Sequence, residues 1–230
     1  MGSLNVFGDS VLRGAGYDST SGRLIVNDRF GLGDVAARAG FSIRNFSKFG
    51  CTITKAWDYI QRMFQKIDCD MVLMNFGGND CDYNWKAVSK RPDDSHAPNT
   101  SIEDFRSTYD RMLDYIKERR SLPVLATLVP VQEDVYLDHV CRTQNLDRES
   151  IRRWRDGLET DLASHQKKYS DAVVEIARSR EVPLLDIRSA FESEKDPKSL
   201  MGPDGIHPNA RGQKVINGCF ESFISGYLAF

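Results

Sequence analysis

The chain has 230 residues, with 31 Lys and Arg against 33 Asp and Glu, which gives a formal net charge of −2. This balance lacks the basic patch that nucleic acids or anionic membrane surfaces attract. Hydrophobic residues make up 40% of the chain and aromatic residues 10%, enough for a sizeable core and too much for a disordered protein. No apolar run approaches the ~20 residues of a membrane-spanning helix. We therefore expect neither a nucleic-acid partner nor a membrane partner.

The cysteines indicate a reducing compartment. Five of them are scattered along the chain without a CxxC pair, a pattern that favours free thiols in a cytoplasmic protein over a disulfide framework. The first apolar run, Leu4–Phe7, begins too early and is too short for the core of a signal peptide. A chain whose signal peptide had been removed would begin in the same way, so the cytoplasmic prediction depends on the thiols.

Five short apolar runs, each followed by a helical or loop stretch, predict the strands of a sheet. They are Leu4–Phe7, Ser42–Phe46, Met71–Phe76, Val124–Val129 and Val182–Ile187. The last three are continuously apolar, which is typical of strands covered on both faces. Strands that alternate with helices predict a doubly wound, parallel α/β sheet. The composition shows no linker and no repeat, so we expect residues 1–230 to form a single domain.

Three of the intervening segments have apolar side chains at helical spacing. One face of the first carries Ile53, Trp57, Ile60 and Phe64. Ser101 and Asp104 resemble a capping box that opens a second helix, running through Ile116. The clearest apolar stripe runs from Val215 to Leu228, and we expect Pro208 near the first turn of that helix.

Two connections, residues 81–100 and 131–148, are unusually long for a compact domain, where loops beyond ~15 residues are uncommon. Both leave the carboxyl end of a predicted strand, where open α/β sheets place their binding sites. In the first connection, Tyr83 and Trp85 are candidates for one wall of a substrate cleft, and packing of the loop onto the domain explains them equally well. The second connection is the candidate for the opposite wall.

Two motifs supply a serine nucleophile and its base. Gly8-Asp9-Ser10 directly follows the first predicted strand, a position that exposes the serine hydroxyl and its backbone N–H at the sheet edge. Asp204 and His207 lie three residues apart in a turn that Gly205 and Pro208 stiffen. A nucleophilic serine needs such a base, together with a carboxylate that orients it. Taken singly, each motif is more often a turn or a helix cap.

Two glycine-containing turns are candidates for holding an oxyanion. Gly77-Gly78-Asn79-Asp80 follows the third predicted strand, where the Asn79 amide can donate a hydrogen bond to developing negative charge. Gly50 follows the second strand, and its backbone N–H is another candidate donor. Each of these is a plain turn when taken alone. Because the carboxyl ends of parallel strands lie side by side, the nucleophile, the donors and the base are expected to converge at one edge.

In this order, the four motifs resemble the four blocks of the SGNH hydrolases, also called GDSL esterases or lipases. The blocks centre on Ser10, Gly50, Asn79 and His207, and the resemblance spans residues 4–228. It implies a three-layer α/β/α sandwich, similar to flavodoxin, with a five-stranded parallel sheet in a single SGNH-type hydrolase domain. It also implies Ser10 as nucleophile, His207 as general base and Asp204 as the residue that orients the imidazole. The implied oxyanion hole consists of the Ser10 and Gly50 N–H groups and the Asn79 side chain.

Other patterns favour ordinary structure over a cofactor or metal site. Residues 31–36 fit GxGxxG/A but do not directly follow a strand, so dinucleotide binding is disfavoured. His139 and Cys141 have no partner cluster nearby in sequence. The arginines of 148–155 are interrupted by acidic residues, as on a solvated helix face. Cys51 and Cys81 are read as small buried residues. We expect no cofactor and no metal.

The resemblance predicts a serine ester hydrolase that works through an acyl-enzyme on a small-molecule ester. Short acyl esters are expected, acetyl in particular and carbohydrate acetates among them; this preference comes from the breadth of the family and from no residue of the chain. An acyltransferase, a thioesterase or a lysophospholipase would use the same triad. A catalytically silent binding module is disfavoured by the intact set of Ser10, Asn79, Asp204 and His207. Nothing in the sequence predicts an oligomeric state.

Overall fold

Five parallel strands form the central sheet of the computed structural model, which describes residues 2–18, 20–26, 31–64 and 69–228. In their order across the sheet, the strands are β4 (Phe41–Asn45), β1 (Gly2–Gly8), β5 (Met71–Asn75), β6 (Leu122–Ala126) and β7 (Leu184–Leu185). Every residue of β5 is buried, as the continuously apolar sequence predicts for a strand covered on both faces. The predicted parallel α/β sheet is therefore confirmed.

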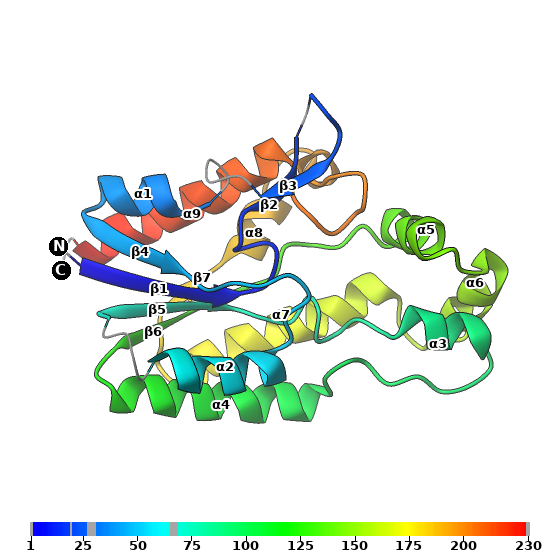
Figure 1. Cartoon of the computed structure of the whole chain (residues 1–230), viewed down its shortest axis with the longest axis horizontal. Helices are drawn as coiled ribbons and strands as arrows, with labels where there is room; N and C mark the ends of the chain where they lie inside the picture. Colours follow the sequence, from blue (N-terminus) through cyan, green and yellow to red (C-terminus); the bar gives the residue numbers. More distant parts are fainter. Residues whose placement is uncertain (1, 19, 27–30, 65–68, 229–230) are drawn as a thin grey trace.

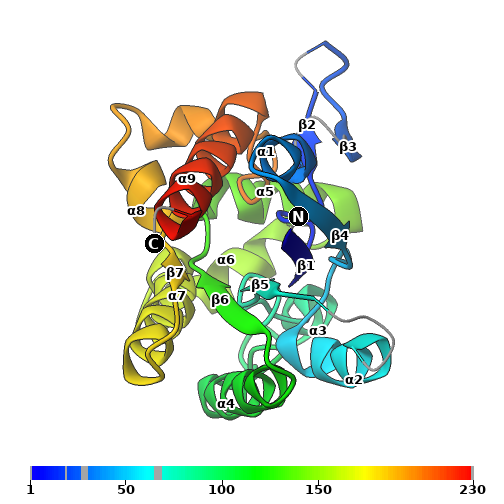
Figure 2. The same cartoon turned by 90° about the vertical axis from the view of Figure 1, so that its left-hand side faces the viewer.

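Helices cover both faces of this sheet and complete the three layers (Figures 1 and 2). The core on one face joins α2 (Ile53–Phe64), α4 (Ile102–Glu118) and α7 (Leu162–Ser179). The core on the other face joins α1 (Gly33–Arg38), α8 (Ile187–Glu192) and α9 (Ala210–Leu228). Alternate residues of β5 serve the two cores, because successive side chains of a strand point to opposite faces.

Three further helices gather beyond the carboxyl end of the sheet, on the right of Figure 1. They are α3 (Trp85–Lys90), α5 (Glu133–Gln144) and α6 (Arg148–Asp156), and they share a small apolar core of their own. We call these three helices the cap. The cap corrects the expectation of two long irregular connections, since most of 131–148 and part of 81–100 is helical. The apolar pattern missed α5 because it buries only Val140 and Cys141.

Several element boundaries also differ from the sequence prediction. The last strand is two residues long rather than six, because Asp186 caps α8 by accepting a hydrogen bond from the Ser189 N–H at 3.1 Å. A two-stranded antiparallel hairpin, β2 (Ala15–Tyr17) with β3 (Leu24–Val26), was not predicted. Pro208 lies before α9 and bridges to Met201, so it is not in the first turn of that helix.

The capping prediction for α4 is confirmed. Ser101 Oγ accepts the Asp104 N–H at 3.0 Å, and its hydroxyl is also 3.0 Å from the Asp104 carboxylate. The short 3₁₀ helix η2 (Pro197–Leu200) precedes the Asp204–His207 turn. Phe64 and Leu228 belong to two of the predicted apolar helix faces. The structure describes their backbone as helical but does not describe their side chains. Within the described ranges, no helix is both long enough and apolar enough to cross a membrane.

Candidate active site

Ser10, His207 and Asp204 form a continuous hydrogen-bonded chain. His207 Nε2 lies 2.8 Å from Ser10 Oγ, and His207 Nδ1 lies 2.6 Å from Asp204 Oδ2. All three residues are buried. Although 197 positions separate Ser10 from His207, the sheet brings them together as the sequence motifs predicted. This order of hydroxyl, imidazole and carboxylate is the arrangement that lets a histidine accept a serine proton.

The turn after β1 presents the Ser10 side chain at the sheet edge. The Arg13 N–H donates to the Asp9 carbonyl at 3.1 Å, and the Val11 N–H donates to Asp9 Oδ1 at 2.9 Å. These two bonds fold the chain back immediately after the strand. Gly8 is required here, because a Cβ at that position would lie 2.9 Å from the Asn75 carbonyl of the neighbouring strand. The strand therefore ends with the serine hydroxyl facing His207.

The Asp204 carboxylate organises its own turn as well as the imidazole. Oδ1 accepts the backbone N–H groups of Ile206 at 3.1 Å and His207 at 3.0 Å. Burial alone would raise the pKa of Asp204, but hydrogen bonds and the charge of His207 outweigh it and lower the pKa. Gly205 has a φ of +74°, and a Cβ there would lie 2.7 Å from the Gln132 carbonyl. Only glycine fits this position without strain.

Asn79 lies beside the triad and is tied to the turn that carries the serine. Its Nδ2 donates to Asp9 Oδ2 at 3.1 Å, and its backbone carbonyl accepts Asn99 Nδ2 at 3.0 Å. Gly77 precedes it with a φ of +134°, so the chain leaves β5 in a conformation that favours glycine. Gly50 also has a positive φ, +64°, and lines the same cavity as Asn79 and Ser10. The candidate oxyanion donors therefore share one space with the triad.

Two buried aspartates next to these residues were not singled out by the sequence. Asp9 joins the serine turn to Asn79, and burial raises its pKa. Asp80 Oδ1 accepts a hydrogen bond of 2.9 Å from the N–H of Ile53, which is the first residue of α2. Burial raises the pKa of Asp80 to about 6. These bonds could not be predicted from the motifs that contain the two acids, because the bonding partners are 70 and 27 positions apart in the chain.

A cavity of about 190 Å³ opens from the triad and runs beneath the cap. Ser10, Gly50, Asn79 and His207 line its outer end. Tyr83 and Trp85 line it farther in, and both are also buried in the apolar core of the cap. The two interpretations of these aromatic residues are thus compatible in space. Cavity-lining residues that the sequence did not indicate include Phe49, Leu128, Val129, Leu162, His165 and Gln166.

The remaining candidates take ordinary structural positions. Cys51 and Cys81 are buried free thiols, and burial raises the pKa of both. Residues 148–156 form α6, where Arg148 pairs with Asp138 and Arg153 pairs with Asp93 on the surface. Among the residues that the structure describes, no group of three or more His, Cys, Asp or Glu could hold a metal ion.

A family model for GDSL-like lipases/acylhydrolases matches residues 6–215. The chain belongs to this family. It is a carboxylic ester hydrolase by that membership, and the resemblance to the SGNH hydrolases is confirmed. Among curated proteins, the GDSL esterase/lipase CPRD49 of Arabidopsis thaliana is 27% identical over 201 residues, which cover 81% of this chain and 67% of that protein.

Solved structures share the fold of this family member at low sequence identity. A lipase/acylhydrolase from Enterococcus faecalis superposes with a TM-score of 0.66 at 18% identity, covering 99% of this chain and 97% of its own. A variant of Axe2, an acetyl xylan esterase from Geobacillus stearothermophilus, gives a TM-score of 0.66 at 15% identity, over 97% of this chain and 94% of its own. At these identities the match extends to the fold alone.

Proposed function

We propose that Ser10 is the nucleophile of a two-step ester hydrolysis that proceeds through an acyl-enzyme. The observation that carries this proposal is the chain of contacts from Ser10 Oγ through His207 to Asp204, at 2.8 Å and 2.6 Å. A serine hydroxyl is a weak nucleophile until an adjacent base takes its proton. His207 Nε2 is within reach of that proton, and the Asp204 carboxylate fixes the tautomer in which Nε2 is free to accept it.

In the first step, Ser10 Oγ attacks the ester carbonyl carbon while His207 Nε2 accepts the hydroxyl proton. The new Oγ–C bond makes the carbonyl carbon tetrahedral, the π electron pair moves onto the carbonyl oxygen as an oxyanion, and Asp204 stabilises the imidazolium. His207 then donates the proton to the alkoxide oxygen, which leaves as the alcohol and leaves the acyl group on Ser10. In the second step, His207 deprotonates a water, which attacks the acyl carbon. The acid departs as the proton returns to Ser10.

The N–H groups of Ser10 and Gly50 and the Asn79 amide are proposed to hold the oxyanion. Their support is that all three residues line the cavity at the triad. Asn79 Nδ2 has two hydrogens, and the bond to Asp9 occupies one of them. The other hydrogen is available to the substrate. A donor fixed before the reaction stabilises the transition state without reorganising during it.

Short acyl esters, acetyl esters first among them, are the proposed substrates. The support is the fold shared with the acetyl xylan esterase Axe2, which also makes carbohydrate acetates a substrate class to test.

Hydrolysis of p-nitrophenyl acetate by the wild-type protein and by Ser10→Ala tests this proposal. The variant should be folded, because alanine at this turn removes at most one helix-capping hydrogen bond, which lowers the free energy of unfolding by about 1 kcal/mol. Its kcat should fall by orders of magnitude, as it does when one member of a coupled triad is lost. Ser107→Ala, an exposed serine on α4, is the matched control and should keep wild-type rates. Wild-type turnover by a folded Ser10→Ala protein would overturn the assignment.

A further inference from the structure

The cavity beneath the cap continues well past the triad, so it must take up a part of the ester other than the reacting carbonyl. Its volume is about 190 Å³. A cavity of ~150 Å³ in a protein core holds one benzene molecule, which sets the scale. The cavity therefore has room for a six-membered ring with one or two further atoms, and an acetyl group alone would leave most of it empty.

Several of the polar side chains that line the cavity are already engaged by the protein itself. Asp82 accepts hydrogen bonds on both carboxylate oxygens, from Trp85 Nε1 at 2.9 Å and from the Tyr136 hydroxyl at 2.7 Å. Asn75 donates its amide nitrogen to the carbonyls of Ala126 and Thr127 at 3.1 and 3.0 Å. Asp82, Trp85 and Tyr136 thus bond to one another, and the amide nitrogen of Asn75 bonds to the backbone.

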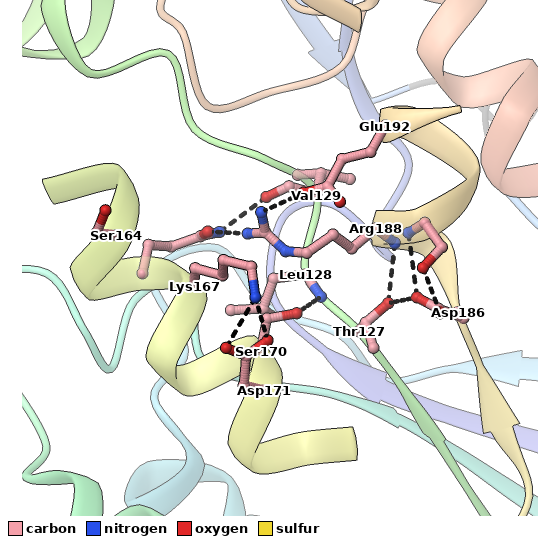
Figure 3. A network of polar contacts seen from close by, with 12 residues as sticks. Thr127, Leu128, Val129, Ser164, Lys167, Ser170, Asp171, Asp186, Arg188 and Glu192 are labelled. Carbon is pink, nitrogen blue, oxygen red and sulfur yellow. Dashed lines mark hydrogen bonds and ion pairs between the residues drawn. The ribbon is translucent and has the colours of Figure 1, made fainter. Parts of the chain in front are cut away.

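Gln166 is also engaged by a buried network, whose members Val129, Arg188 and Glu192 are labelled in Figure 3. Its Nε2 donates to the Val129 carbonyl at 2.8 Å, and its Oε1 accepts a hydrogen bond from the Arg188 guanidinium. Arg188 is only 8% exposed and reaches Gln166 from α8, with Glu192 as its other partner at 3.1 Å. The carboxamide of Gln166 is therefore fixed in orientation, with its oxygen and one of its two Nε2 hydrogens engaged by the protein.

Apolar side chains supply the rest of the surface. Val11, Leu128, Val129 and Leu162 line the cavity, and the Tyr83 ring packs edge-on against Trp154, with ring centroids 4.8 Å apart. At the mouth, Phe49 is 52% exposed, an unusual position for a large apolar side chain, with its ring centroid 6.5 Å from that of His207. An exposed aromatic residue beside a reaction centre provides a surface for an apolar substrate group.

A sugar ring would lose hydrogen bonds in this cavity. Each of its hydroxyl groups would leave water, and few groups of the lining side chains are free to replace it, among them the Tyr83 hydroxyl, Asn75 Oδ1 and the buried, unpaired Nε2 of His165. Burying an unsatisfied polar group is costly, whereas burying a methylene is favourable and corresponds to roughly fourfold in binding. The satisfied wall therefore selects against a polyhydroxylated group.

From this wall we infer that the cavity binds an apolar group about the size of one six-membered ring, on the acyl or the alcohol side of the ester. A carbohydrate would have to lie outside it. This inference rests on the proposed ester hydrolysis at Ser10, and it narrows the substrate from any short ester to one with an apolar group of ring size. Which side of the ester carries that group is decided by the experiment.

Four esters measured by release of acid separate these possibilities. Ethyl acetate is the small reference, cyclohexyl acetate places the apolar ring on the alcohol, ethyl hexanoate places an apolar chain on the acyl group, and a methyl xyloside monoacetate places a sugar on the alcohol. We expect kcat/KM for one of the two apolar esters to exceed that for ethyl acetate by at least tenfold, since several methylenes become buried. We expect the sugar acetate to stay within a fewfold of ethyl acetate.

Two tryptophan variants link the preference to the cavity. Val131 lines the cavity and is half-buried, so the larger side chain of Val131→Trp should fill the cavity. The ratio of kcat/KM for the preferred apolar ester to kcat/KM for ethyl acetate should then fall by tenfold or more. Val174→Trp, at an exposed position on α7, is the matched control and should keep the ratio. Hydrolysis without a preference, a preference for the sugar acetate, or an unchanged ratio in Val131→Trp would each overturn the inference while leaving Ser10 in place. Absence of any Ser10-dependent hydrolysis would instead overturn the proposed function.

Discussion

Asn79 Nδ2 donates a hydrogen bond of 3.1 Å to Asp9 Oδ2, so the candidate oxyanion donor is tied to the residue that precedes the nucleophile. The other oxygen of the same carboxylate accepts the Val11 N–H at 2.9 Å, in the turn around Ser10. One buried carboxylate therefore sets the relative position of the two groups that must act together on the carbonyl. Its role is one of positioning, because its oxygens contact protein groups.

We expect Asp9→Asn to lower kcat for p-nitrophenyl acetate by about tenfold, less than loss of the oxyanion donor itself, which costs ~10²–10³-fold. The neutral amide is a weaker acceptor than the carboxylate and can turn an N–H toward Asn79, which frees the Asn79 side chain to move. KM should change little. Asp34→Asn, an exposed substitution on α1, is the control. An unchanged kcat in Asp9→Asn would show that Asn79 holds its position without this bond.

Asn79→Ala removes the donor itself. The developing oxyanion needs the amide more than the neutral carbonyl does, so kcat should fall ~10²–10³-fold, about 2.7–4 kcal/mol, with little change in KM. Labelling of Ser10 by a fluorophosphonate should persist at a reduced rate, because the nucleophile and base are intact. Circular dichroism controls for folding. A higher KM at constant kcat would instead mean that Asn79 binds substrate and transition state equally.

We expect Asp80 to make the stability of the protein depend on pH. Burial raises its pKa from an ordinary 3.8 to about 6, so the folded chain binds this proton more tightly than the unfolded chain does. The stability that this proton contributes is present below pH 3.8 and lost as the pH rises through about 6. In the wild type, the unfolding free energy should therefore fall by about 3 kcal/mol between pH 3 and pH 7, and Asp80→Asn should remove this fall.

Urea unfolding of the wild type and of Asp80→Asn at half-unit pH steps measures this difference. The asparagine can still accept the Ile53 N–H, so this hydrogen bond at the start of α2 is expected to survive. Asp58→Asn, an exposed substitution on α2, is the control and should run parallel to the wild type. Parallel curves for Asp80→Asn as well would mean that Asp80 has the same pKa in the folded and unfolded chains.

Arg188→Met tests the network behind the cavity. Gln166 Oε1 would lose its partner while remaining buried, which should lower the free energy of unfolding by about 1–3 kcal/mol. Glu192→Gln alters the other partner of Arg188, whose side chain is 49% exposed, and should change stability by less than about 0.5 kcal/mol. Equal stability of both variants and the wild type would show that Gln166 finds another partner.

The sheet could be predicted from the sequence where burial on both faces made the strands apolar throughout. Met71–Asn75 is such a strand, and its predicted extent was correct to one residue. The last strand was predicted too long, because Ile187 is as apolar as the strand but belongs to a helix that Asp186 caps. The cap was missed since α3 has six residues and α5 buries few of its side chains, so neither shows a helical apolar stripe.

The candidate site could be predicted as far as strand ends determine it. Ser10, Gly50 and Asn79 each follow a strand of one parallel sheet, so their convergence follows from topology alone. The roles of Asp9 and Arg188 could not be predicted, because each depends on one side-chain contact between segments far apart in the chain. The engaged state of Asp82 and Gln166, on which the proposed substrate preference depends, is likewise visible only once partners and distances are known.

The most direct test of the account is to locate the acyl group during turnover. The protein is mixed with excess p-nitrophenyl acetate, quenched in acid within milliseconds, digested and analysed by mass spectrometry. If Ser10 is the nucleophile, one acetyl group per chain is expected on the peptide that contains Ser10, with strongly reduced occupancy in His207→Ala and none in Ser10→Ala. Acetyl at another residue, or steady release of acid with no acyl group on Ser10, would contradict this assignment.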